Sequence, residues 1–248
     1  MSVLYALWLR ELKRYWRSKQ RMLVSLAQPV LYLLVFGFGM SPVYQKAGGG
    51  DFVQFLAPGI IAMTVLTSSI GSGIVLLFDR QFGFLKETLV APVSRVQIML
   101  GRTCGAATVA ILQGLLVAVV CLTAGFRPVD PSMAAEALVF LILTALAFAG
   151  LGTALGASIK DMSGYQSVLS LLILPTILLS GMLFPLDHLP VLLAALTNID
   201  PLSYGVDGLR ATLIGQAHFG ILLDLTVLLA VIMLFLGIAA WRFAKIEP

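Results

Sequence analysis

Residues 52–78 read FVQFLAPGIIAMTVLTSSIGSGIVLLF, a long apolar run without a single charged side chain. A helix of about 20 apolar residues crosses the roughly 30 Å hydrocarbon core of a bilayer, and only helices or closed barrels satisfy their backbone groups there. The run does not alternate apolar and polar residues, as a barrel strand would. We therefore predict that this stretch is a membrane-spanning helix.

The rest of the chain has the same character. Of its 248 residues, 59% are hydrophobic and only 11% are charged, whereas soluble domains carry about 25% charged residues. This composition excludes a soluble fold and predicts one all-α integral membrane domain over residues 1–248. The six predicted spans are residues 21–40, 52–78, 98–124, 134–159, 164–185 and 220–241.

The basic residues predict the orientation of these spans. Most of the 16 lysines and arginines fall in the N-terminal segment, the C-terminal segment and the loops that follow the second and fourth spans. Only Lys46, Arg127 and Arg210 fall on the other side. Because Lys and Arg resist translocation, we expect the basic side, with both termini, to be cytoplasmic. The net charge of +4 then reflects membrane topology and not nucleic-acid binding.

The N-terminal segment, residues 1–20, has an amphipathic pattern at helical spacing. We predict a helix in the membrane interface, with its cations toward phosphate and cytosol. It serves either as an anchor alone or also as a contact for a cytoplasmic partner. Leu7 departs from the pattern and Glu11 lies on its border. The apolar arc holds Leu4, Tyr5, Trp8, Leu12, Tyr15 and Trp16, and the opposite arc holds Arg10, Lys13, Arg14 and Arg17.

The cytoplasmic stretch 79–97 is too polar to span and too apolar to be a plain linker. A short helix that ends before Pro92 would place its apolar side chains in a groove of another protein. These side chains are Phe82, Phe84, Leu85, Leu89 and Val90. Packing of these side chains against the chain's own span ends is the alternative.

Residues 186–219 form a long outer segment, in which we predict two short helices. Asp200 followed by Pro201 is typical of a helix start, because a carboxylate accepts the free amide protons and proline needs no N–H there. The segment either dips back into the outer leaflet as a gate or forms a surface cap.

Small residues recur one helical turn apart at Gly101 and Gly105, and at Gly152 and Gly156. Such pairs let helix backbones approach closely, so we predict helix packing at both.

Polar residues within the spans are few. We expect these residues either to line a transport pathway or, in the case of the hydroxyl groups, to donate hydrogen bonds to backbone carbonyls of their own helix. The candidates are Thr64, Ser68 and Ser72 on the second span and Gln113 in the third.

Several kinds of chemistry have no visible place in this sequence. It contains no Gly-x-x-x-x-Gly-Lys-Ser/Thr motif for nucleotide phosphates, and His188 and His218 lack metal-ligand spacing. Asp224 and Glu136 are expected to reach the membrane interface, which makes a proton-coupled secondary transporter the second hypothesis and not the first. A non-transporting membrane scaffold is the third.

The order of motifs along the chain resembles that of the membrane subunit of type-2 ABC exporters, the permeases that export drugs, polysaccharides and lipo-oligosaccharides in bacteria and archaea. The resemblance covers nearly the whole chain. The motifs that carry it are Phe55-Leu-Ala-Pro-Gly59, Asp79-Arg-Gln-Phe-Gly-Phe-Leu-Lys-Glu87, Ala91-Pro-Val-Ser-Arg95, Leu179-Ser-Gly-Met-Leu-Phe-Pro185 and Asp200-Pro-Leu-Ser-Tyr204.

The resemblance implies a homodimeric pathway in the cell membrane, surrounded by membrane lipids and driven by two copies of a separate ATP-binding subunit. ATP and magnesium would bind to that partner, and no cofactor to this chain. The cargo would be amphipathic, lipid-like, a drug or a glycan, and nucleic acid is not expected as a partner.

The resemblance also implies roles for individual residues. Members often carry glutamate where Gln81 stands here, so an ion pair with the ATPase is lost or relocated. The implied coupling helix that contacts the ATPase is Arg80, Gln81, Phe82, Gly83, Phe84, Leu85, Lys86 and Glu87; the implied connecting helix holds Trp8, Arg10, Lys13, Arg14 and Arg17; and the implied outer gate holds Phe184, Pro185, Asp200, Pro201 and Tyr204.

Overall fold

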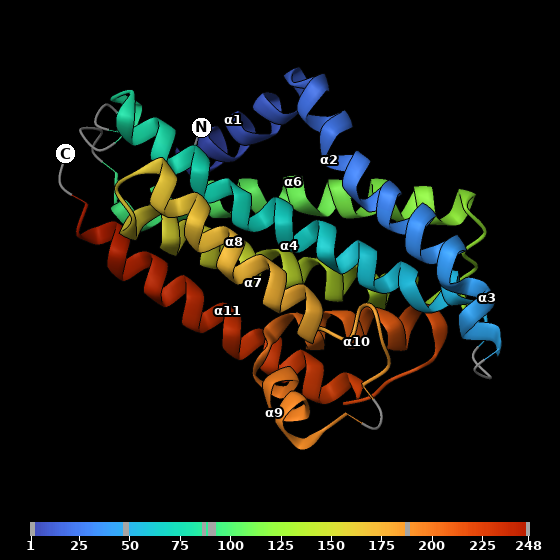
Figure 1. The fold of residues 1–248 in the computed structure, drawn as a ribbon. Helices are drawn as coiled ribbons and strands as arrows, with labels where there is room; N and C mark the ends of the chain where they lie inside the picture. The colour runs from blue at the N-terminus through green and yellow to red at the C-terminus, as the bar shows by residue number, and fades with distance from the viewer. Residues whose placement is uncertain (1–2, 47–49, 86–87, 89–92, 187–188, 247–248) are drawn as a thin grey trace.

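The computed structural model describes residues 3–46, 50–85, 88, 93–186 and 189–246. Within these residues the fold is entirely helical, and long helices lie side by side in one bundle (Figure 1). Six helical stretches are long and apolar enough to cross a membrane, which confirms the prediction of an all-α, six-span membrane fold. The long helices are α2 (Lys19–Tyr32), continued by η1 (Leu33–Phe38) and α3 (Gly39–Lys46), then α4 (Phe52–Gln81), α6 (Arg95–Thr123), α7 (Ala134–Ser158), α8 (Met162–Leu179) and α11 (Ile221–Ala244).

The two ends of the bundle differ in what covers them. At the basal end, Leu7, Leu85, Ile98 and Phe243 pack in one cluster, so the first helix, the end of α4, the start of α6 and the end of α11 meet there. At the distal end, two short helices, α9 (Val191–Ile199) and α10 (Pro201–Ile214), lie near the start of α11 (Figure 1). A 3₁₀ turn, η2 (Pro131–Met133), precedes α7.

The second span, α4, is the central helix of the bundle. Its side chains are buried along most of its length, and it contacts α2, α6, α7, α8 and α10. Gly152 and Gly156 allow α7 to approach it, because a Cβ at either position would lie 2.7 Å from a backbone oxygen of α4, that of Ile70 or Gly73. This confirms the packing interpretation of that glycine pair.

Two helix ends differ most from the predicted spans. The fifth helix ends at Leu179 and not at residue 185, because the chain turns at Ser180 and at Gly181, whose φ is +72°. The first span continues past residue 40 to Lys46, and residues 33–38 within it form a π-helix. Pro42 has no N–H to offer the carbonyl of Phe38, the last residue of that wider turn.

Apolar side chains of α2, α8 and α11 cover the outside of the bundle. Leu23, Leu171 and Met233 are examples that are largely exposed. In a helix that faces lipid, exposed apolar side chains need no protein partner.

Candidate functional site

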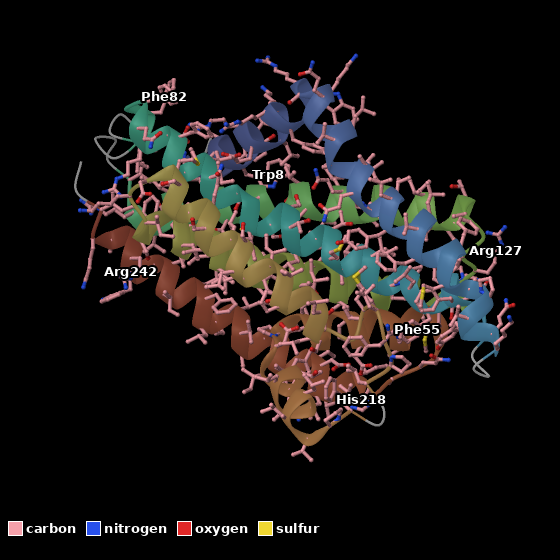
Figure 2. All side chains as sticks on the ribbon, viewed as in Figure 1. Trp8, Phe55, Phe82, Arg127, His218 and Arg242 are labelled. Atoms are coloured by element: carbon pink, nitrogen blue, oxygen red, sulfur yellow. The ribbon has the colours of Figure 1, made fainter. Side chains whose placement is uncertain are left out.

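The first helix, α1 (Val3–Arg17), packs along α6 at the basal end. A Cβ at Gly101 would lie 3.0 Å from the carbonyl oxygen of Leu4, and one at Gly105 would lie 2.9 Å from the Cβ of Glu11. The indole Nε1 of Trp8 donates to Oγ1 of Thr108 over 3.0 Å, and Figure 2 places Trp8 between these two helices. Gly101 and Gly105 therefore also form a packing site, and the helix that packs on them is α1.

The face by which α1 packs is not centred on the predicted apolar arc. Leu7, which departs from that arc, is buried in the basal cluster beside Ile98 and Met99, whereas Trp16 is 75% exposed. The reason is the line of contact with α6, which takes in the side of α1 bearing Leu7 and Glu11. The connecting-helix residues Trp8, Arg10, Lys13, Arg14 and Arg17 all lie on α1, with the last three exposed.

Asp79 joins three helices at the basal end. Its carboxylate contacts the guanidinium of Arg10 on α1 and that of Arg102 on α6. Asp79 and Arg102 are each only 6% exposed. A buried carboxylate between two guanidinium groups fixes the end of α4 against α1 and α6, because loss of either partner leaves an uncompensated charge.

The residues proposed as a coupling helix begin directly after Asp79. Arg80 and Gln81 are the last residues of α4, and Gly83 has a φ of +82° that turns the chain. Phe82 and Phe84 are 71% and 55% exposed, and Phe82 projects from the end of α4 in Figure 2. Lys86, Glu87, Leu89 and Val90 lie outside the described residues.

Leu85 differs from its two aromatic neighbours, because it is only 1% exposed and belongs to the basal cluster. For Leu85 the alternative interpretation is correct, because its side chain packs against the chain's own helix ends. The exposed apolar surface here is therefore aromatic. The rings of Phe78 and Phe82 stack with their centroids 6.1 Å apart.

A hollow of about 470 Å³ separates these rings from α1. It combines aromatic surface with guanidinium groups, so it suits a segment that carries both apolar and acidic side chains. Its lining residues are Arg10, Arg14, Phe78, Asp79, Phe82 and Phe84.

Arg95, the first residue of α6, fastens the C-terminal helix to the same end. Its Nη1 donates to the carbonyl oxygens of Ala244 and Ile246, over 2.6 and 2.8 Å. A cation at this place satisfies carbonyls that the end of a helix leaves free. Nothing local in the sequence indicates this contact, which spans most of the chain.

The polar residues of the second span divide into two environments. The hydroxyl of Thr64 is buried and donates to the carbonyl of Ile60 over 2.8 Å, the back-bonding alternative. Ser68 and Ser72 instead line a cavity of about 40 Å³ with Gln113, beside α1. Such a volume holds about one water molecule, and Gln113 also donates to Ser25 Oγ over 2.9 Å.

At the distal end, Arg210 of α10 joins the Phe55–Gly59 motif to the turn after α8. Its guanidinium lies 4.0 Å from the ring centroid of Phe55 and donates to the carbonyl of Gly181 over 3.0 Å. A Cβ at Gly59 would lie 2.9 Å from that of Met182. The two sequence motifs therefore pack against each other.

The proposed gate residues lie around the start of α10. The prediction of a helix start at Asp200 and Pro201 is confirmed, because Asp200 accepts the N–H of Leu202 over 3.1 Å and α10 begins at Pro201. Burial raises the pKa of the Asp200 carboxyl to about 7. The hydroxyl of Tyr204 donates to the carbonyl of Asn198 over 2.7 Å. Phe184 is half-buried and Pro185 is exposed.

Two further carboxylates at this end are held inside. Asp207 accepts the N–H groups of His218 and Phe219, each over 2.8 Å. Asp224 is 0% exposed, so the expectation that it reaches the membrane interface is wrong. It lies in the first turn of α11, which α10 covers. Glu136 is exposed, as expected.

Metal chemistry finds no support in the described part of the chain, where no three His, Cys, Asp or Glu residues lie close enough to hold an ion.

Sequence comparisons agree with this architecture. The family model described as ABC-2 type transporter matches residues 2–214. Nodulation protein J of Rhizobium leguminosarum bv. viciae is 32% identical over 209 residues, which cover 82% of this chain and 79% of the relative. Nodulation protein J of Rhizobium meliloti is 32% identical over 225 residues, 88% of this chain and 84% of the relative.

A third relative, the transport permease ycf38 of Porphyra purpurea, is 30% identical over 201 residues, which cover 79% of this chain and 68% of the relative. The family match spans most of the helical bundle, from α1 to the end of α10. The chain therefore belongs to the ABC-2 type transporter family and is a membrane permease subunit of an ABC transporter.

Proposed function

We propose that two copies of this chain form an export pathway through the cell membrane, driven by two copies of a separate ATP-binding subunit at the basal end. Family membership implies such a partner subunit, which would bind the ATP and magnesium. The basal end would be cytoplasmic, with both termini inside. The observation that carries the proposal is the pair of exposed rings, Phe82 and Phe84, at the end of the helix that Asp79 fixes.

The basal contacts provide a route by which motion of the ATPase reaches the spans. Residues 80–87 would dock on that subunit as a coupling helix. Leu85 is buried in the basal cluster, and Asp79 contacts both α1 and α6. A push on this segment therefore moves α1, α4 and α6 together, because buried, close-packed elements do not deform independently.

A second copy of the chain would complete the pathway. Both α2 and α8 contact α4, while few of their own apolar side chains are buried and several, such as Leu23 and Leu171, are exposed. One six-helix bundle offers little free volume among its packed spans. The polar cavity of Ser68, Ser72 and Gln113 lies beside α1, and we propose it as the edge of the pathway.

The cargo we propose is an amphipathic or lipid-like molecule, with drugs and glycans as further classes. Apolar spans with only scattered hydroxyl groups suit a molecule that enters from the inner leaflet. The relatives named nodulation protein J and transport permease ycf38 do not by their names narrow this choice.

The test is co-purification of the chain with its ATP-binding subunit. We expect the double variant Phe82→Ala and Phe84→Ala to lose the partner and its stimulated ATPase activity, while the bundle keeps its melting temperature. The matched control is Phe38→Ala on η1, an aromatic ring that is similarly exposed. Unchanged binding and ATPase activity in the double variant would reject the coupling role.

A proton-coupled secondary transporter is the second candidate, and the burial of Asp224 favours it. Buried carboxylates within spans often serve proton transfer. That function requires uptake or efflux in liposomes driven by a pH gradient without ATPase, and its loss in Asp224→Asn. Transport that depends on ATP hydrolysis and persists in Asp224→Asn would exclude it.

A further inference from the structure

The turn between α1 and α2 encloses a hollow of about 890 Å³ on the outside of the bundle. Ser18 forms this turn, and no acidic residue among those that the structure describes lines the hollow. Cations dominate its wall. The lining residues are Ala6, Leu9, Arg10, Lys13, Arg14, Arg17, Ser18, Lys19 and Gln20.

Most of these cations have no counter-charge in the described part of the chain. Arg10 is paired with Asp79, but Lys13, Arg14, Arg17 and Lys19 form no ion pair there. All four are exposed. Like charges gathered around one concavity repel each other and create a positive potential that an anion relieves.

An apolar groove of about 330 Å³ adjoins this hollow. Its wall is almost entirely carbon, from Leu12, Tyr15, Trp16 and Leu112. Lys13 and Arg17 line both the groove and the cationic hollow. The same two side chains therefore mark the boundary between a surface for charge and a surface for hydrocarbon.

We propose that this elbow binds a phosphate-bearing amphiphile whose headgroup has a net negative charge, with its phosphate in the cationic hollow and an acyl chain in the groove of Leu12, Trp16 and Leu112. Arg and Lys donate charge-assisted hydrogen bonds to phosphate oxygens, and an exposed tryptophan such as Trp16 is typical of headgroup depth. The site requires only that the chain lies in a membrane, so it does not depend on coupling to an ATPase.

Two sources of such a molecule exist, a resident phospholipid of the inner leaflet and the exported cargo. Both present the same chemistry to the elbow, a phosphate ester on a hydrocarbon tail. They differ in what ATP hydrolysis does to the bound molecule.

The binding test uses the purified full chain in an uncharged detergent, with calorimetric titration of dihexanoyl phosphatidylglycerol. We expect saturable binding, and weaker binding of dihexanoyl phosphatidylcholine and of inorganic phosphate. Lys13→Gln with Arg17→Gln is expected to weaken phosphatidylglycerol binding about thirtyfold, since each basic residue near an anionic lipid contributes about one kcal/mol. The matched control, Lys160→Gln with Lys245→Gln, removes two exposed cations outside the elbow and leaves binding unchanged.

A third variant separates the groove from the hollow. Trp16→Ala removes an exposed ring, so it does not affect folding, and it is expected to weaken binding of the lipid while binding of inorganic phosphate stays the same. Equal binding of the two lipids, or equal weakening by the elbow and control pairs, would overturn the proposal. Phosphate that binds as tightly as phosphatidylglycerol would also overturn it.

Mass spectrometry of the lipid that co-purifies with the chain and its ATP-binding subunit identifies the source of the bound molecule. A phosphate lipid that remains bound through ATP hydrolysis is resident, and one that is released is cargo. Either result supports the site, and co-purification unaffected by Lys13→Gln with Arg17→Gln contradicts it.

Discussion

The two ends of the bundle use charge in opposite ways. At the basal end, one buried carboxylate, Asp79, holds three helices together, and beyond it aromatic rings and cations face outward. At the distal end, Arg210 and Asp207 point inward and bond to the backbone of the loops that they hold. The basal end therefore leaves aromatic rings and cations exposed, whereas the charged side chains of the distal end bond to the chain's own loops.

The largest expected effect tests the fixed part of the basal end. Asp79→Ala leaves Arg102 buried without its counter-charge, which costs about 3–5 kcal/mol of stability. The measurement is thermal unfolding in detergent. The double variant Asp79→Ala with Arg102→Met removes both buried charges and is expected to recover most of the loss; a single variant as stable as the parent would show that the cluster does not hold the helices.

The next prediction probes the distal end by overpacking. Gly59→Ala places a methyl group against Met182, and such crowding costs about 1–3 kcal/mol. Gly71→Ala on the same helix is the control, because its Cβ would meet nothing within 4 Å. Equal unfolding temperatures for the two variants would mean that the turn after α8 is not packed on α4.

A smaller effect concerns Asp200, whose folded pKa of about 7 lies above the value of about 3.9 in an unfolded chain. The folded protein therefore binds the proton more tightly, so its stability declines as pH rises from about 4 to about 7. Asp200→Asn keeps a capping side chain but removes this titration.

We expect the melting temperature of Asp200→Asn to exceed that of the parent at pH 8 by roughly 2–4 °C, the equivalent of about 1 kcal/mol for a chain of this size. At pH 4 the two should be similar. A difference that does not change with pH would contradict the burial of this carboxyl.

The smallest effect concerns the contact between α1 and α6. Trp8→Phe removes the hydrogen bond to Thr108 but keeps an aromatic ring, so it should cost about 0.5–1.5 kcal/mol. Thr108→Val is the matched change on the other side. If the hydrogen bond is real, combining both variants costs little more than either alone, and strictly additive losses would argue against it.

The sequence predicts what depends on local chemistry. The spans follow from apolar runs long enough to cross a bilayer, and the start of α10 follows from Asp200 and Pro201. The glycine pairs indicate close packing, but they do not say that Gly101 and Gly105 hold α1.

Contacts that depend on the register of distant helices could not be predicted. Arg102 within an apolar run signals a buried partner, yet only the packed bundle identifies Asp79 as that partner. Leu7 and Leu85 are buried because α1 and the end of α4 meet at the basal end. Asp224 is enclosed because α10 covers the first turn of α11. The position of Asp224 near the end of a span does not reveal this contact.

Among the described residues, the first span alone contains a π-helical turn, at residues 33–38. It accommodates one more residue per turn than an α-helix, and relaxing it would rotate the segment beyond it by about 100°. That segment carries Tyr44, whose ring lies 5.0 Å from that of Phe52 and 5.8 Å from that of Phe55. The wider turn thus sets the rotation at which Tyr44 meets the central helix α4.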